Sequence, residues 1–326
     1  MTKRLSHAKL LTLAGALALL AGCSSKGGKA GAEQADQKAA PMTVALITHA
    51  APGDTFWDLV RLGAEAAAAS NNVSLRYVGD PDGGAQVTLV QNALDSKIDA
   101  IAITLAKPSA MAPAVRLAVE RGTPVVALNA GIDAWQPLGV TSYFGSDDGT
   151  AGEAAGQRAA KDGAKHVLCV AHEQGHVALE ARCDGLSRGF TPGRFEKVYV
   201  MGTDMPSVRS TIAAKLKQDP SIDLVVTLGA PFAVTARDSV RDLGSKAKVA
   251  TFDLNEQIPA MIRNGSLEWA IDQQPFLQGY MAVTALSLQH RTGNIIGGGK
   301  PVLTGPFFVD RSNVDKLGSA AARAKH

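Results

Sequence analysis

The sequence predicts an α/β fold made of two doubly wound, Rossmann-like lobes, each built on a parallel sheet. Short apolar runs without polar alternation recur along the chain, as expected of strands that are buried on both faces. Amphipathic helical stretches separate these runs, and such alternation produces parallel strands through right-handed crossovers. Nine strands are many for one open sheet, and the body from residue 42 onward is long enough for two domains.

The predicted strands are rich in Val, Ile, Leu and Ala. They cover residues 43–48, 74–79, 98–104, 124–128, 165–171, 195–201, 222–228, 247–252 and 267–273. In the first predicted helix, Leu59, Leu62 and Ala66 recur at helical spacing and form one apolar face. The predicted helices cover 54–70, 109–121, 150–162, 177–190, 207–218, 231–243 and 275–290. The polar, Gly-containing segment 142–148 predicts the break between the lobes.

The N-terminus has the pattern of an export signal. Basic residues are concentrated in residues 1–9, and residues 10–21 form an apolar run. A membrane span needs roughly 20 apolar residues, so this run predicts a signal peptide over 1–22. Leu20-Ala21-Gly22-Cys23 resembles the lipobox of bacterial lipoproteins, and this resemblance implies a lipid on Cys23. The alternative is a plain secretory signal with an incidental cysteine.

Residues 23–41 are expected to be a lipidated flexible tether. Residues 24–41 carry no bulky apolar side chain and cannot bury enough surface to fold. We therefore expect the body to lie outside the cytoplasm, anchored to the cell membrane through lipid alone. Exported domains meet oxidising conditions, so Cys169 and Cys183 could form a disulfide or remain two buried thiols.

Composition and motifs argue against several function classes. The net charge is only +3, and without a basic stripe no nucleic-acid partner is expected. The Gly-rich segment 79–84 does not fit a dinucleotide fingerprint, and the adjacent acids Asp147 and Asp148 are weak evidence for glycosidase chemistry. His172 and His176 have no third ligand at a diagnostic spacing. We expect no enzyme activity, no cofactor and no metal.

Polar and aromatic residues follow several predicted strands, where open parallel sheets bind ligands. Carboxylates, amides and a guanidinium suit a neutral polyol, because each hydroxyl both donates and accepts hydrogen bonds. Aromatic faces can cover the C–H groups of such a ligand. The candidate ligand-binding residues are Asp54, Phe56, Trp57, Asn129, His176, Arg182, Asp253 and Gln273.

Taken singly, these residues have ordinary structural explanations. Asp54 could cap its helix, and the two aromatic side chains could belong to the core. Asn129 and Asp253 could be turn residues, and Arg182 could lie on a helix surface. The binding hypothesis therefore depends on their agreement, since they are all predicted at the same edge of the two sheets.

Several motifs, taken in order and with their spacing, resemble a known family. They are Asp54-Thr55-Phe56-Trp57 followed by Gly63-Ala64, Pro124-Val125-Val126-Ala127-Leu128-Asn129, Gly175-His176 with Glu180-Ala181-Arg182-Cys183-Asp184-Gly185, Thr251-Phe252-Asp253, and Ile271-Asp272-Gln273-Gln274-Pro275. From Thr43 to about Leu317 the chain resembles the periplasmic ribose- and galactose-binding proteins. These are the type I solute-binding components of ABC sugar importers.

The resemblance implies a role for each candidate residue. Asp54 and Asp253 would accept hydrogen bonds from ligand hydroxyls, and Arg182 would donate a bidentate pair. Asn129 and Gln273 would bond further hydroxyls. The aromatic pair at 56–57 would cover an apolar face of the ligand, and the histidine at 176 is the weaker match.

Three departures from the family pattern predict a pocket unlike a pyranose site. Gly229 stands where the family usually has an asparagine, and Ala130 stands where the ribose branch has an arginine. No aromatic residue lies near Thr203, where the family often places its second stacking residue; Met201 and Met205 are the nearest bulky side chains. We expect a linear polyol or a smaller sugar as the ligand.

The resemblance also implies discontinuous lobes joined by a three-strand hinge. The N-terminal lobe would comprise 42–146 plus 274–303, and the C-terminal lobe 147–273 plus 304–326. Ligand would favour closure of the lobes, and the closed monomer would deliver it to the transmembrane subunits of an ABC permease. The alternative is a sensory module that presents a sugar or furanose to a chemoreceptor or sensor kinase. A repressor is disfavoured because no DNA-binding segment precedes the first strand.

Overall fold

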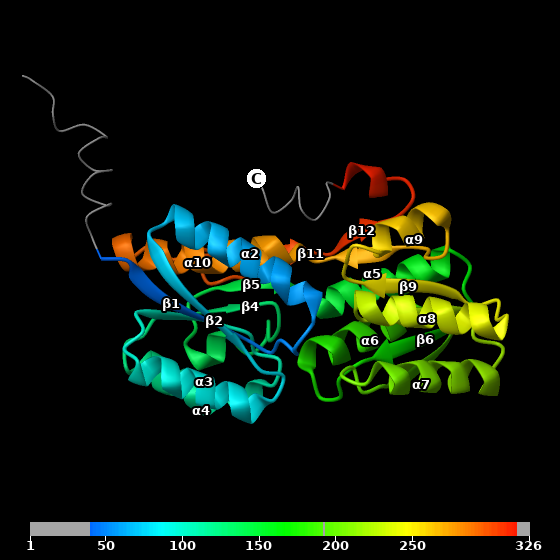
Figure 1. Ribbon diagram of the computed structural model, residues 1–326, viewed down its shortest axis with the longest axis horizontal. Helices are drawn as coiled ribbons and strands as arrows, with labels where there is room; N and C mark the ends of the chain where they lie inside the picture. The colour runs from blue at the N-terminus through cyan, green and yellow to red at the C-terminus, as the bar shows by residue number, and fades with distance from the viewer. Residues whose placement is uncertain (1–39, 192, 318–326) are drawn as a thin grey trace, which may run out of the picture. The chain divides into compact units, whose positions relative to one another are not determined.

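A computed structural model describes residues 40–191 and 193–317 (Figure 1). The predicted signal peptide, the lipid site Cys23 and the tether up to residue 39 lie outside the described residues, as do residues 318–326 of the predicted C-terminal lobe. Among the helices of the described part, none combines the length and apolar character needed to cross a membrane.

The described chain forms two six-stranded sheets, one in each of the two lobes that the sequence predicts. The first has the order β11 (Val302–Gly305), β5 (Tyr143–Ser146), β4 (Val125–Leu128), β3 (Ala100–Ile103), β1 (Met42–Thr48), β2 (Val73–Gly79). The second has the order β12 (Phe307–Val309), β10 (Ala270–Asp272), β9 (Lys248–Phe252), β8 (Leu224–Thr227), β6 (His166–Ala171), β7 (Arg194–Tyr199). All pairs are parallel except β10 with β12.

Helices cover both faces of each sheet (Figure 1). The first lobe contains α2 (Thr55–Ser70), α3 (Gly83–Asp95), α4 (Pro108–Glu120), α10 (Pro275–Thr292) and the 3₁₀ turn η1 (Gln136–Leu138). The second contains α5 (Asp148–Lys161), α6 (Val177–Gly189), α7 (Met205–Gln218), α8 (Ala230–Leu243), α9 (Ile258–Asn264) and η2 (Val314–Lys316).

Strand side chains point alternately into two cores in each lobe. In β1, Val44 and Leu46 pack with α2 and α10, whereas Ala45 and Ile47 pack with α3 and α4. The second lobe repeats this division, with α5 and α6 on one face and α7, α8 and α9 on the other. This two-sided burial explains why the strands lack polar alternation.

Within residues 40–191 and 193–317, the chain passes between the sheets three times. It leaves the first sheet after β5, returns from β10 into α10, and crosses again between β11 and β12. The third passage lies at Gly305-Pro306, slightly later than the predicted boundary at 303, because β11 remains paired with β5 through Gly305.

The helix pair that carries part of the site packs unusually closely. A Cβ at Gly152 of α5 would overlap the carbonyl oxygen of Arg182 in α6, and one at Gly185 of α6 would overlap the carbonyl oxygen of Gly149. The predicted disulfide is confirmed: Cys169 of β6 is bonded to Cys183 of α6, with an S–S distance of 1.99 Å. Both features hold α6 against its neighbours.

Two parts of the first lobe differ from the sequence prediction. The segment 142–148, predicted as a break, contains the buried strand β5. Helix α3 was not predicted, because its first two residues are Gly83 and Gly84 and glycine disfavours helices. The structure supplies the start signal: the Asp82 side chain accepts a hydrogen bond from the Ala85 amide. In the second lobe, the short helix α9 was also missed.

Candidate functional site

A cavity of about 830 Å³ lies between the two lobes, beyond the carboxyl ends of the strands. All eight candidate binding residues line it. They come from both lobes and from the connection between β10 and α10. Parallel strands bring their carboxyl ends to one edge, which explains why residues distant in sequence meet here. Their role in ligand binding stays a prediction.

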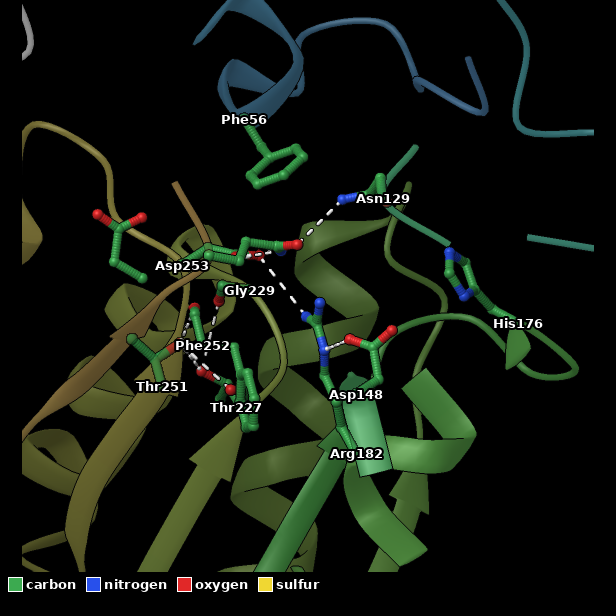
Figure 2. A network of polar contacts seen from close by, with 12 residues as sticks. Phe56, Asn129, Asp148, His176, Arg182, Thr227, Gly229, Thr251, Phe252 and Asp253 are labelled. Atoms are coloured by element: carbon green, nitrogen blue, oxygen red, sulfur yellow. Dashed lines mark hydrogen bonds and ion pairs between the residues drawn. The ribbon is translucent and has the colours of Figure 1, made fainter. Parts of the chain in front are cut away.

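Arg182 forms the floor of this cavity and is only 4% exposed. Its Nε donates to Oδ1 of Asp148 at 2.7 Å, its Nη1 lies 3.9 Å from Oδ2 of Asp253, and its guanidinium lies over the Phe252 ring. Figure 2 shows this network. A buried charge needs such partners. Burial raises the pKa of Asp148 to about 6, although Arg182 opposes the shift.

Asp253 follows β9 directly and adopts a left-handed backbone conformation, with φ of 68°. Its Oδ1 accepts a hydrogen bond of 2.7 Å from Nε2 of Gln273. Burial raises the pKa of Asp253 to about 7, and Arg182 only partly offsets this effect. This carboxyl group therefore binds a proton more readily than an ordinary aspartate, and in its protonated form it can donate as well as accept a hydrogen bond.

Asn129 holds the equivalent place in the first lobe, directly after β4, and has φ of 67°. Asn and Asp tolerate this backbone conformation better than most residues. Nδ2 of Asn129 donates to Oε1 of both Gln273 and Gln278 at 3.1 Å. Gln273 therefore joins Asn129 of one lobe to Asp253 of the other.

Helix α2 brings an acid and an aromatic ring to the cavity. Asp54 caps the helix by accepting a hydrogen bond from the Phe56 amide at 3.1 Å, and burial raises its pKa. Phe56 is partly exposed and points toward the polar network (Figure 2). Trp57 packs edge-on against Phe56 and is 5% exposed, so it belongs to the core as well as to the wall.

A histidine pair joins the lobes at the side of the cavity. Nε2 of His176 lies 2.9 Å from Nε2 of His49, and Nδ1 of His49 lies 2.7 Å from Oγ1 of Thr104. Burial lowers the pKa of His49 to about 3 and that of His176 well below its usual value. Positive neighbours, Lys107 and Arg182 among them, lower both further. The pair therefore exists as neutral imidazoles.

Three further contacts close the lobes against each other. Nζ of Lys107 lies 2.7 Å from Oε1 of Glu173, and the Val177 amide donates to the carbonyl of Ala106 at 3.1 Å. Ala106, Ala130 and Ala178 form a small buried apolar cluster. Ala130 thus contributes to the packing of the lobes against each other.

Sequence reasoning missed several residues that line or support the cavity. They are His49, Lys107, Asp148, His172 and Phe232. A usable signal existed for His49, which directly follows strand 43–48 just as His172 follows strand 165–171. Asp148 gave no such signal, because its pairing with Arg182 depends on tertiary packing.

Two other features could suggest chemistry elsewhere. Gly185-Leu186-Ser187-Arg188-Gly189 has the spacing of a nucleophile elbow, but it lies inside α6 and not at a strand-to-helix turn. His166, Glu196 and Asp219 place ligand atoms within 4.8 Å of one another. Arg194 pairs with both acids there. Lys215 pairs with Glu196 as well. Because two cations already balance the two acids, the cluster is a poor cation site.

Comparison with known proteins agrees with this geometry. Residues 44–292 match the family described as periplasmic binding protein domain. The chain is a type I periplasmic binding protein. This family comprises sugar-binding components of ABC transporters and is in general not enzymatic.

Individual members show the likeness in more detail. A carbohydrate transporter from Acidothermus cellulolyticus, solved in complex with myo-inositol, is 56% identical with a TM-score of 0.86 and is matched over 88% of this chain and 100% of that one. An ABC sugar transporter from Legionella pneumophila is 26% identical with a TM-score of 0.73, over 81% and 99% of the two chains. A xylose/arabinose-binding protein of Sulfolobus acidocaldarius is 23% identical, over 83% of this chain and 71% of that protein.

The buried histidines predict an acid sensitivity of the binding protein. A histidine whose pKa is lowered by folding contributes stability above the unfolded pKa of about 6.5, and this contribution is lost as the pH falls below it. For His49 the free energy of unfolding lost on going to pH 5.5 is about 1–2 kcal/mol. From pH 7.5 to pH 5.5, the free energy of unfolding should decrease less in His49→Gln than in the wild type. Chemical denaturation of both proteins at both pH values measures this difference.

The exposed His290 on α10 provides a matched control. His290→Gln should keep the wild-type pH dependence. The raised pKa values of Asp148 and Asp253 act in the opposite direction, but they are present in all three proteins and cancel in the comparison. Identical pH dependence in the wild type and His49→Gln would contradict the buried, neutral state of His49.

Proposed function

We propose that this protein is an extracytoplasmic, lipid-anchored receptor that captures a neutral polyol or sugar between its lobes and delivers it to an ABC importer. Within that class we favour a cyclic polyol of the inositol type. The observation that carries the proposal is the cavity itself, to which both lobes contribute hydroxyl-binding groups. The 56% identity to a protein solved with myo-inositol supports the choice of ligand.

The electrostatics of the cavity favour an uncharged ligand. The guanidinium of Arg182 is already balanced by Asp148 and Asp253. An anionic ligand would be repelled by these carboxylates, and a cationic ligand would be repelled by the guanidinium. A neutral polyol instead uses the remaining donors and acceptors of Asp253, Asn129 and Gln273, so that no charge is left unpaired.

The shape of a cyclic polyol also fits the lining. Its ring carbons carry C–H groups that Phe56 can cover, while its hydroxyls point outward to the polar side chains. This proposal replaces the linear polyol or smaller sugar expected from the sequence. The missing aromatic residue near Thr203 had suggested a smaller ligand, but the second lobe contributes the ring of Phe232 to the cavity.

Closure is the mechanical part of the proposal. A ligand that touches Asn129 in one lobe and Asp253 in the other binds the closed form better, and therefore shifts the population toward it. The pairs His49–His176 and Lys107–Glu173 span the two lobes at the side of the cavity and would separate on opening. The importer's transmembrane subunits would then receive ligand from the closed monomer.

The proposed lipid on Cys23 would keep this receptor beside its importer. Such an anchor would raise the effective concentration of the body at the membrane. Expressed in a bacterium that processes lipoproteins, the wild type should fractionate with membranes and Cys23→Ala should be soluble. Equal membrane association of both proteins would contradict the anchor.

Calorimetry should identify the ligand class. The protein, stripped of bound ligand by unfolding and refolding, is titrated with myo-inositol, arabinose, xylose and allose. Asp253→Ala should weaken binding of the preferred compound by about 10- to 100-fold, because it removes hydrogen bonds from a buried polar site.

Asp242→Ala is the matched control, since it removes an exposed carboxylate on α8 far from the cavity lining. Its affinity should equal that of the wild type. The proposal fails if none of the four compounds binds, or if Asp253→Ala binds as tightly as Asp242→Ala.

A further inference from the structure

His172 occupies the wall of the cavity contributed by the second lobe. It follows β6 directly and is partly exposed. Its imidazole ring stacks on Phe232 in the first turn of α8, with ring centroids 4.3 Å apart and planes inclined by 19°. Phe232 is 8% exposed and belongs to the hydrophobic core of this lobe. The imidazole is therefore held against a fixed surface.

Two glycines make room for this stacked pair. A Cβ at Gly229 would lie 3.1 Å from Cδ2 of Phe232 and 3.5 Å from Cε1 of His172. A Cβ at Gly202 would lie 2.9 Å from the carbonyl oxygen of His172, 3.1 Å from Cζ of Phe232 and 3.2 Å from Cβ of His172. Gly229 has an extended backbone with φ of −170°, which any residue can adopt. A side chain at position 229 would therefore be disfavoured because it collides with the stacked rings, and not because of the backbone conformation.

His49 holds the equivalent place in the first lobe, directly after β1. His172 differs from it in the hydrogen bonds of its ring nitrogens. His49 uses both of its nitrogens, toward Thr104 and His176. Within the described residues His172 makes no side-chain hydrogen bond, and its Nδ1 is fully buried. Its Nε2 is not among the fully buried atoms, and His172 lines the cavity, so a ligand hydroxyl can bond Nε2.

The protonation state of His172 suits a neutral ligand. Burial lowers its pKa to about 3, and His176 and Arg182 lower it further. A neutral imidazole donates from one nitrogen and accepts at the other. It can therefore bind a hydroxyl in either sense without introducing charge.

We propose that His172 is a specificity-determining residue that hydrogen-bonds one hydroxyl of the bound polyol while Phe232 fixes the plane of its ring. This inference rests on the proposed function and adds to it. A site built to hydrogen-bond a hydroxyl rejects analogues that lack it, because its polar atoms are then left unpaired. His172 thus selects against ligands that are deoxygenated at one position.

The test is calorimetry with myo-inositol and a set of monodeoxy-inositols. His172→Phe should weaken myo-inositol binding by about 10- to 100-fold, whereas His172→Gln should stay within about fivefold, because an amide also donates and accepts. In the wild type one deoxy compound should bind much more weakly than myo-inositol. In His172→Phe that difference should disappear, which a purely structural role would not produce.

A glycine pair provides a second measurement if His172→Phe does not fold. Gly229→Ala should displace the stacked rings and weaken myo-inositol binding by about tenfold. Gly149→Ala, where the nearest atom lies 3.4 Å from the new Cβ, should bind normally. The role of His172 is overturned if His172→Phe or Gly229→Ala binds myo-inositol as tightly as the wild type. It is also overturned if His172→Phe still binds the deoxy compound more weakly than myo-inositol by the wild-type factor. Neither result would contradict the proposed function. A wild type that binds none of the polyols or sugars overturns both.

Discussion

The buried guanidinium of Arg182 is the constraint around which the second lobe is organised. A charge removed from water must be paired, and here Asp148 at the start of α5 and Asp253 at the end of β9 supply the partners. Close packing of α5 on α6 and the Cys169–Cys183 bond hold the arginine in reach of both. The same arrangement exposes Asp253 to the cavity and, through Gln273, connects it to Asn129 in the first lobe.

Much of the fold and the site was predictable because both follow from one regularity. Strands buried on both faces lose polar alternation, and parallel strands bring their carboxyl ends to one edge. Residues such as Asn129 and Asp253, read only from their place after a strand, therefore meet in space. A structural role does not prevent a residue from lining the cavity. Asp54, for example, caps α2 and also lines the cavity.

What the sequence could not supply depends on tertiary partners. Asp148 lies beside Asp147 in the chain and gives no hint of Arg182. The interlobe pair of His49 and His176 joins residues from different lobes, and no local pattern records it. The departures from the family pattern became intelligible only in the structure: Ala130 packs between the lobes, and Gly229 leaves space for the stacked ring of Phe232. Helix α3 was missed because its glycine-rich start outweighed its apolar face.

We propose that polar groups from both lobes bind one neutral polyol in this cavity. A crystal structure of the protein with myo-inositol tests it most directly. We expect the ring to lie between Phe56 and the second lobe, with its hydroxyls hydrogen-bonded to Asn129 and to Asp253. A ligand bound outside the cavity, or one contacted by the polar groups of a single lobe, would contradict it.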